Sequence, residues 1–165
     1  MSVLTQQEAT DKRNRLMEQN KTVVFTNGCF DLLHRGHLHL LSESRQQGDY
    51  LVVGVNTDDS IRRLKGADRP VKSKEDRGQV LDALSMVNDV VFFGEDTPRQ
   101  LIQRLTPDVL VKGSDYEPSE VVGAQHVKKN GGRLHLVDLL PGHSTSALIE
   151  KIKHSDGEGT THDNG

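Results

Sequence analysis

Cysteine, tryptophan and long apolar runs are almost or entirely missing from this sequence of 165 residues. Cys29 is the single cysteine, which excludes an internal disulfide and fits a reducing compartment. No apolar run approaches the roughly 20 residues that a membrane helix needs, and the first residues have no apolar signal core. We therefore expect a cytoplasmic protein with no membrane partner.

Aromatic residues and basic charge are also scarce. Phe, Trp and Tyr make up 4% of the chain, too few for a base-stacking platform, and the formal net charge is −3, whereas a dedicated nucleic-acid binder usually has a basic excess. We expect no nucleic-acid partner. A small anionic substrate fits, because local clusters of Lys, Arg and His matter there more than the total charge. With 33% hydrophobic and 27% charged residues, the composition is that of an ordinary globular domain.

Alternating strand and helix patterns predict one α/β domain over residues 1–153, with an N-terminal helical segment (1–20) and a core (21–153). Short apolar runs predict five strands, over residues 22–26, 50–55, 90–93, 109–111 and 134–137. Helical patterns cover residues 5–19, 38–47, 60–64, 74–86, 98–105, 118–130 and 144–153. This order predicts a doubly wound, mostly parallel five-stranded sheet with helices on both faces, a Rossmann-like arrangement. Residues 154–165 have no apolar anchor and are predicted to be a disordered tail.

Three loops rich in polar residues follow predicted strands: residues 26–37, 112–116 and 138–146. In a doubly wound sheet, ligands lie beyond the carboxyl ends of the strands. All three loops fall at that edge. The sequence therefore predicts one shared site built from them.

The segment His34-Arg35-Gly36-His37 stands at the start of a predicted helix, directly after the first of these loops. Residues three apart share a helix face, so both imidazoles point the same way, and Gly36 leaves room for a bulky anion. The alternative without a ligand is that both histidines simply lie on the surface of the helix. A metal site is another, but Asp31 is the only obvious third ligand nearby. Phosphate binding explains more, since imidazolium donors and helix N-terminal N–H groups favour an anion.

The glycines of this loop fit neither a Walker A loop nor a G-x-G-x-x-G fingerprint, which disfavours kinase-like and dinucleotide-binding functions. Instead, residues 27–37 (Asn-Gly-Cys-Phe-Asp-Leu-Leu-His-Arg-Gly-His) resemble the H-x-G-H signature of the cytidylyltransferase-like nucleotidyltransferases. Ser144-Thr145-Ser146 resembles the second motif of that family, a Ser/Thr-rich helix start that contacts the triphosphate. The resemblance covers roughly residues 21–153.

Within that family, the chain is most similar to the bacterial D-glycero-β-D-manno-heptose 1-phosphate adenylyltransferases. Residues 25–31, 111–116 and 130–132 carry this likeness. Many such relatives are fused to a sugar kinase, and we expect a stand-alone version here. The chain departs from the usual pattern in ending Ser-Thr-Ser-Ala at residues 144–147. Glycerol-3-phosphate cytidylyltransferases have an Arg-Thr pair where this chain has residues 140–143, Leu-Pro-Gly-His.

The resemblance implies that ATP, with Mg²⁺ on its triphosphate, transfers AMP to heptose 1-phosphate, giving ADP-heptose and pyrophosphate for lipopolysaccharide-type sugar synthesis. It implies catalytic roles for His34, His37 and Lys112. The implied nucleotide-binding residues are Thr26, Asn27, Gly28, Phe30, Asp31, Gly36, Ser144, Thr145 and Ser146. The implied residues for the sugar phosphate are Asn56, Asp58, Lys112, Gly113, Asp115 and Tyr116. A homodimer is also implied.

Several of these side chains have plainer interpretations. Ser144, Thr145, Asp31 and Asp58 could be local caps, and Cys29 a small core residue. His143 could reach phosphate, whereas His39, His126, His135 and His154 are expected to be structural or superficial. The cationic loop 65–74 is expected to carry solvated charges, as are the side chains of Arg69, Lys72, Lys74 and Arg77.

Two other functions stay open from the sequence. One is a cytidylyltransferase for glycerol 3-phosphate or a similar small phosphorylated alcohol. The other is a non-catalytic nucleotide-binding module, although the intact His34/His37 pair argues against a retired site.

Overall fold

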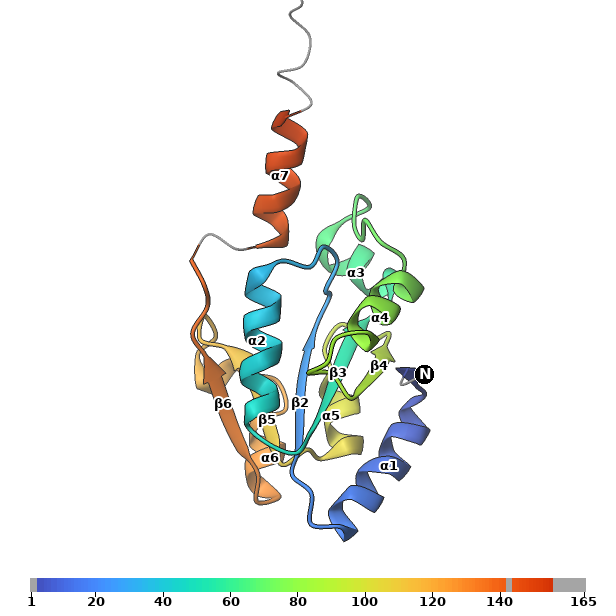
Figure 1. Ribbon diagram of the computed structural model, residues 1–165, viewed down its shortest axis with the longest axis vertical. Coiled ribbons are helices and arrows are strands. Elements are labelled where there is room, and N and C mark those ends of the chain that lie inside the picture. The colour runs from blue at the N-terminus through green and yellow to red at the C-terminus, as the bar shows by residue number, and fades with distance from the viewer. Residues whose placement is uncertain (1–2, 142–143, 156–165) are drawn as a thin grey trace, which may run out of the picture.

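The computed structural model describes residues 3–141 and 144–155, and its centre is a fully parallel six-stranded sheet (Figure 1). The strand order is β1-β4-β3-β2-β5-β6. The strands are β1 (Val3–Leu4), β2 (Val23–Gly28), β3 (Tyr50–Asn56), β4 (Asp89–Phe93), β5 (Val109–Gly113) and β6 (Arg133–Val137). The predicted fold class is therefore confirmed, but five strands is wrong. Sequence patterning overlooked β1, whose two residues pair with Val90 and Val91 at the sheet edge, because a run of two cannot show a period.

The helices lie between the strands as expected. They are α1 (Gln6–Glu18), α2 (Arg35–Gln46), α3 (Asp58–Lys65), α4 (Lys74–Asp82), α5 (Arg99–Leu105), α6 (Ala124–Lys129) and α7 (Thr145–Ser155), with a 3₁₀ turn η1 at Pro118–Glu120. The continuous helix predicted over residues 118–130 is wrong. Gly123 has a φ of +85° and interrupts it, and a Cβ there would lie 2.8 Å from Ile102.

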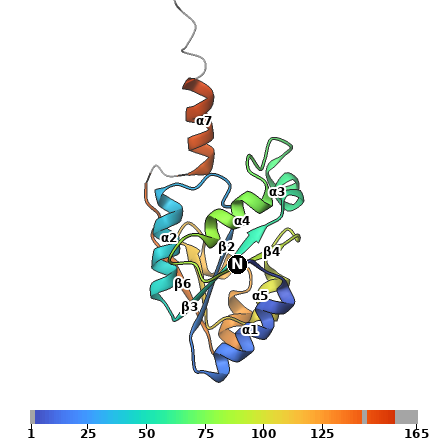
Figure 2. The ribbon, with the colours of Figure 1, turned by 45° about the vertical axis from the view of Figure 1, so that its right-hand side comes forward.

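The two faces of the sheet are covered by different helices (Figure 2). One apolar cluster joins the sheet to α1, α5 and α6 through Ala9, Ile102 and Val127. The other joins it to α2 and α4 through Leu41 and Leu81. Because both faces are buried, the strands are nearly continuous runs of Val, Leu and Phe rather than alternating patterns.

The order of the strands in the sheet indicates where a ligand site is expected. The chain passes from β2 to β3 on one side of β2, while β5 pairs with β2 on the other side. The strand order therefore reverses between β2 and β5, and such a switch point opens a crevice at the carboxyl ends of the strands. The β2–α2 and β5–η1 loops leave the sheet there.

The last helix, α7, has no buried residue and extends away from the sheet (Figure 1). It runs to Ser155, so residues 154 and 155 of the predicted tail are helical, and residues 156–165 lie outside the described part of the chain. Over residues 3–141 and 144–155, none of the helices is long and apolar enough to cross a membrane.

Candidate active site

A cavity of about 530 Å³ opens at the carboxyl edge of the sheet, where β2 and β5 diverge. Asn27 and Gly28 end β2, Asn56 ends β3, and Lys112 and Gly113 end β5; all of them line this cavity. Such a volume suits a small-molecule ligand. Each of the three loops of the predicted shared site contributes at least one residue to the lining of this cavity.

His34 and His37 lie against each other beside this cavity. Their ring centroids are 3.9 Å apart with the planes inclined by 33°, and His37 lines the cavity. His34 caps α2: the N–H of Gly36 donates to Nδ1 of His34 (3.1 Å), and the N–H of His34 donates to Nδ1 of His37 (3.3 Å). Since both Nδ1 atoms accept, each neutral ring carries its proton on Nε2. His37, which lines the cavity, can therefore donate from Nε2–H.

The charge on His37 differs from the sequence-based expectation of an imidazolium. Burial, followed by the neighbouring His34 and Lys65, lowers the pKa of His37 to about 4. His37 is therefore neutral near pH 7. It can donate a hydrogen bond to a phosphate oxygen but adds no positive charge to the site.

Lys112 supplies a cation to the floor of the cavity. Its Nζ lies 3.5 Å from the carbonyl oxygen of Asn27 and 5.2 Å from the ring centroid of Tyr116. Burial lowers the pKa of Lys112 to about 8, an effect that Asp115 and Cys29 oppose. The ammonium group is thus mostly charged at pH 7 and poorly hydrated, a state that favours pairing with an anionic ligand.

The structure separates the predicted site residues into two groups. Those that line the cavity are Asn27, Gly28, Phe30, His37, Asn56, Lys112, Gly113, Asp115 and Tyr116. Those that do not are Thr26, Asp31, His34, Gly36, Asp58, Ser144, Thr145 and Ser146. Asn27 has a further property that fits a ligand site: its side-chain oxygen is buried and has no hydrogen-bond partner among the described residues. A buried acceptor of this kind calls for a donor.

Several predicted binding residues have internal partners instead. The Thr26 hydroxyl donates to the Val111 carbonyl across β2 and β5. The buried carboxylate of Asp31 accepts hydrogen bonds from the N–H groups of Val71 and Lys72, at 2.8–2.9 Å. Asp31 therefore ties the cationic loop 65–74 to the β2–α2 loop.

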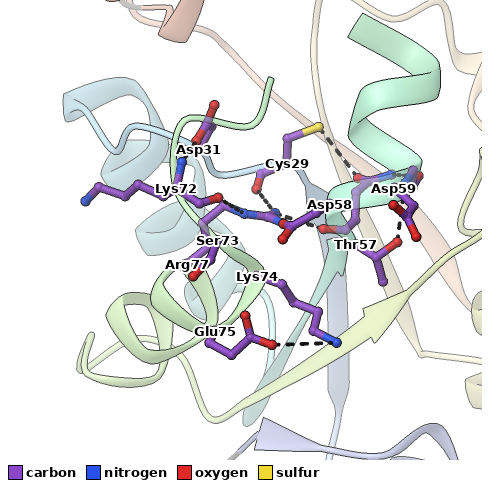
Figure 3. A network of polar contacts seen from close by, with 12 residues as sticks. Cys29, Asp31, Thr57, Asp58, Asp59, Lys72, Ser73, Lys74, Glu75 and Arg77 are labelled. Carbon is purple, nitrogen blue, oxygen red and sulfur yellow. Dashed lines mark hydrogen bonds and ion pairs between the residues drawn. The ribbon is translucent and has the colours of Figure 1, made fainter. Parts of the chain in front are cut away.

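Arg77 is the clearest correction to the expectations for charged residues. It was expected to be solvated, yet it is only 1% exposed and is one of the largest fully buried side chains. Its Nη2 pairs with Asp58 at 2.6 Å, so the carboxylate of Asp58 is engaged by an arginine next to the site. Figure 3 shows this network between α4, α3, the β2–α2 loop and the loop 65–74.

Ser144, Thr145 and Ser146 start α7 close to the β2–α2 loop. The N–H of Ala147 donates to Ser144 Oγ, which caps the helix. The Thr145 hydroxyl donates to the Leu32 carbonyl (3.2 Å), and Arg69 Nη2 donates to Ser146 Oγ (3.3 Å). The second motif thus lies beside the first and beside the cationic loop. His143 lies outside the described residues.

Sequence analysis missed part of the cavity wall. These lining residues include Leu64, Lys65, Asp96, Thr97, Pro98, Glu120, Val121 and Leu139. Residues 94–98 follow β4, so the strand-end rule would have found them had it been applied to every strand. Lys65 is part of the loop 65–74 that is expected to carry solvated charges, but it lines the cavity.

Over the described residues, 3–141 and 144–155, there is no group of three or more His, Cys, Asp or Glu residues that could hold a metal ion. The His34/His37 pair in particular has both Nδ1 atoms engaged by backbone N–H groups.

Comparison with known proteins gives consistent results. The family model described as cytidylyltransferase-like matches residues 25–151. The bifunctional protein HldE of Syntrophotalea carbinolica is 56% identical over 134 residues, which are 81% of this chain and 27% of that protein. The bifunctional protein HldE of Acidiphilium cryptum is 51% identical over 151 residues, covering 92% of this chain and 31% of that protein. The chain therefore spans about 30% of the length of these relatives.

Solved structures agree at the level of the fold. The lipopolysaccharide core biosynthesis protein from Thermoplasma volcanium GSS1 matches with a TM-score of 0.60 and 29% identity, over 73% of this chain and 97% of that chain. Pantoate-beta-alanine ligase from Francisella tularensis matches with a TM-score of 0.61 over 94% of this chain and 77% of that chain; at 13% identity it shows a shared fold only. With the family model matching most of the sequence and the paired histidines at the mouth of the first crossover, this chain belongs to the cytidylyltransferase-like family.

Proposed function

We propose that this protein transfers an adenylyl group from ATP to D-glycero-β-D-manno-heptose 1-phosphate. An oxygen of the sugar phosphate attacks the α-phosphorus of ATP. The bond from that phosphorus to the oxygen bridging to the β-phosphorus breaks, and pyrophosphate leaves with the electron pair. ADP-heptose is the other product. No covalent enzyme intermediate is needed, because positioning and charge stabilisation suffice for such a transfer.

The observation that carries this proposal is the meeting of two phosphate-binding groups at one cavity. His37, from the start of α2, and Lys112, from the end of β5, both line it. One is a neutral donor and the other a buried cation. A reaction that joins two phosphates needs both anions desolvated and held together, and this arrangement provides a separate binding group for each.

In this proposal, His34 and His37 direct their Nε2–H groups at the α- and β-phosphates of ATP. Their Nδ1 atoms are held by backbone N–H groups, so the rings are oriented before the substrate arrives. Preorganised donors stabilise the negative charge that develops on phosphoryl oxygens without reorganising during the reaction. A neutral His37 avoids the desolvation cost of a buried imidazolium.

Lys112 is proposed to pair with the phosphate of the sugar, and Asp115 to accept a hydrogen bond from a sugar hydroxyl. Both line the cavity. Ser144, Thr145 and Ser146 are proposed to hold the leaving pyrophosphate at the start of α7, with Arg69 of the cationic loop already bonded to Ser146. Mg²⁺ would enter on the triphosphate as part of the substrate.

The choice of adenine and of a heptose rests on the likeness to heptose 1-phosphate adenylyltransferases described from residues 25–31, 111–116 and 130–132. The similarity to a lipopolysaccharide core biosynthesis protein supports a role in surface-sugar synthesis. The homodimer is proposed on the family resemblance alone, and sedimentation equilibrium tests it. We also propose cytoplasmic residence, in keeping with the single free cysteine.

Pyrophosphate release measured with ATP or CTP against a panel of phosphorylated acceptors tests the proposal. Heptose 1-phosphate with ATP is expected to give the highest kcat/KM. Release with CTP and glycerol 3-phosphate instead would replace it with the cytidylyltransferase alternative. Nucleotide binding by calorimetry with no release for any acceptor would favour a non-catalytic module.

The assignment of the histidines needs its own pair of variants. H37A should lower kcat by about 100-fold or more, the usual loss on removing a transition-state hydrogen-bond donor. H39A is the matched control, since His39 lies on the same helix and contacts the Asp138 carbonyl (3.1 Å), but is not among the residues that line the cavity. Near-normal turnover by H37A at saturating ATP would remove His37 from the mechanism.

A further inference from the structure

The turn between β2 and α2 contains an unusual backbone conformation. Phe30 has a φ of +50°, the left-handed region that non-glycine residues rarely adopt. The side chain of Phe30 is nevertheless buried. Conformations of this type cost free energy and persist only where the surroundings hold them.

Both neighbours of Phe30 are held by another part of the chain. The carbonyl of Cys29 accepts a hydrogen bond from Arg77 Nη1 (2.7 Å). The carboxylate of Asp31 accepts from the N–H groups of Val71 and Lys72. The left-handed residue is therefore fixed on each side, by α4 and by the loop that precedes α4.

Arg77 uses nearly all of its hydrogen-bonding capacity in this network (Figure 3). Besides Cys29, its Nη1 donates to the Asn56 carbonyl (2.8 Å), Nε donates to the Lys72 carbonyl (3.2 Å), and Nη2 donates to Asp58 (2.6 Å). These bonds use four of the five N–H donors of a guanidinium group, and the side chain is 0% exposed. Arg77 is therefore unavailable to bind a phosphate, unlike an exposed arginine at such a site.

The turn determines where the Phe30 ring lies, and the ring contacts His37. The Phe30 and His37 centroids are 5.4 Å apart with the planes inclined by 54°. The ring also lies close to Gly28, where an added Cβ would be 3.0 Å from Phe30 Cε2. The ring is thus confined between the end of β2 and the histidine.

We propose that Arg77 is a positioning residue that maintains the left-handed turn at Phe30 and, through the Phe30 ring, the orientation of His37. The part of this inference that concerns catalysis rests on the proposed function. The part that concerns the geometry of His37 does not.

The test follows the titration of His37 by ¹⁵N NMR together with kcat and KM, in the wild type, R77K and R77M. In the wild type His37 should titrate near pH 4, in surroundings formed by Phe30, His34 and Lys65. In R77M we expect the midpoint to rise by at least about one pH unit, because the loosened turn lets water reach the ring. The value of kcat should fall at least about tenfold, with a smaller change in KM for ATP. R77K keeps the charge but cannot reach four acceptors, and should lie in between.

R13M is the matched control for the loss of a buried arginine. Arg13 is 7% exposed and bonds the carbonyls of Leu105 and Thr106 and the carboxylate of Asp108, on the other face of the sheet. R13M should lower the thermal midpoint while leaving the His37 titration and kcat of the folded protein unchanged. If R77M moves only the thermal midpoint, as R13M does, Arg77 is merely structural and the inference is wrong.

F30L covers the case in which R77M does not fold. It keeps Arg77 and an apolar side chain but removes the ring contact, and should raise the His37 midpoint by a similar amount. Unchanged His37 titration in both F30L and folded R77K would overturn the inference. A raised midpoint in a protein whose wild type releases no pyrophosphate would retain the positioning role and refute the proposed function.

Discussion

The backbone N–H of His34 donates to Nδ1 of His37, and this bond orients the histidine that faces the cavity. The ring of His34 lies 3.9 Å from that of His37 and is itself held by Gly36 N–H. Protonating either Nδ1 would break one of these bonds. His37 is therefore held neutral in a geometry that leaves Nε2–H as its donor, which has measurable consequences for stability and rate.

Protein stability should depend on the protonation of His37 between about pH 4 and 6.5. The folded state keeps this ring neutral down to a pKa of about 4, whereas the unfolded chain takes up the proton near 6.5. The unfolded state binds more protons in that window, so stability falls as the pH decreases through it. Allowing for solvent screening at a partly exposed ring, the loss is about 2 kcal/mol.

H37N provides the comparison, because asparagine can accept the same backbone bond but does not titrate. Urea unfolding at pH 7 and pH 4.5 should show a loss about 2 kcal/mol larger in the wild type than in H37N. The difference between the two proteins cancels the carboxylates that titrate in the same range. Equal losses in both would mean that His37 is exposed to solvent.

Lys112 should set the alkaline limit of sugar-phosphate use. Its pKa is lowered to about 8 by burial, so the free enzyme loses this cation above that pH. If the ammonium pairs with the substrate phosphate, kcat/KM for the sugar phosphate should fall about tenfold for each pH unit above 8. K112R keeps its charge to higher pH and should flatten this limb of the profile. An identical alkaline limb in K112R would assign that limb to another group.

Asp31 should hold the cationic loop 65–74 in place. D31N removes the charge that three short backbone hydrogen bonds stabilise, and should cost about 1.5–3 kcal/mol of folding free energy. Amide hydrogen exchange at Val71 and Lys72 should accelerate. D59N is the matched control: Asp59 is exposed and pairs with Arg62 on the surface, so its effect should stay within about 0.5 kcal/mol. Unchanged hydrogen exchange at both amides in D31N would contradict this role of Asp31.

A side chain at position 113 should disturb the part of the cavity that is proposed to bind the sugar phosphate. A Cβ at this position would lie 2.7 Å from Asp115 Oδ1 and 2.8 Å from Leu139 Cδ2. G113A should therefore raise KM for the sugar phosphate, about tenfold, with little change in KM for ATP. G94A makes the same substitution where the nearest atom is 3.7 Å away, and should alter neither value. A larger effect of G113A on ATP would exchange the two substrate subsites.

Much of this fold could be predicted from local sequence. The runs Leu51-Val52-Val53 and Val109-Leu110-Val111 are buried strands because parallel sheets are covered on both faces, and that produces a strong apolar signal. The break at residues 121–123, between η1 and α6, depends by contrast on the close approach of Gly123 to Ile102 from another helix. A contact between distant segments leaves no periodic pattern.

The sequence predicts those residues of the candidate site whose place follows from their position at the end of a strand. It does not predict those whose place depends on burial in the tertiary structure. His37 and Lys112 follow strands and line the cavity as expected. Nothing local to Lys74–Asp82 distinguishes Arg77 from a solvated arginine, because two of its acceptors, the carbonyls of Cys29 and Asn56, lie 48 and 21 residues away in the sequence. The neutral state of His37 likewise follows from burial, which a sequence pattern does not show.

The most direct test of the account is a crystal structure of the protein with Mg²⁺ and a non-hydrolysable ATP analogue. We expect oxygens of the α- and β-phosphates within about 3 Å of Nε2 of His34 and His37, with the analogue occupying the cavity between β2 and β5. A triphosphate bound away from both rings would contradict the proposed mechanism.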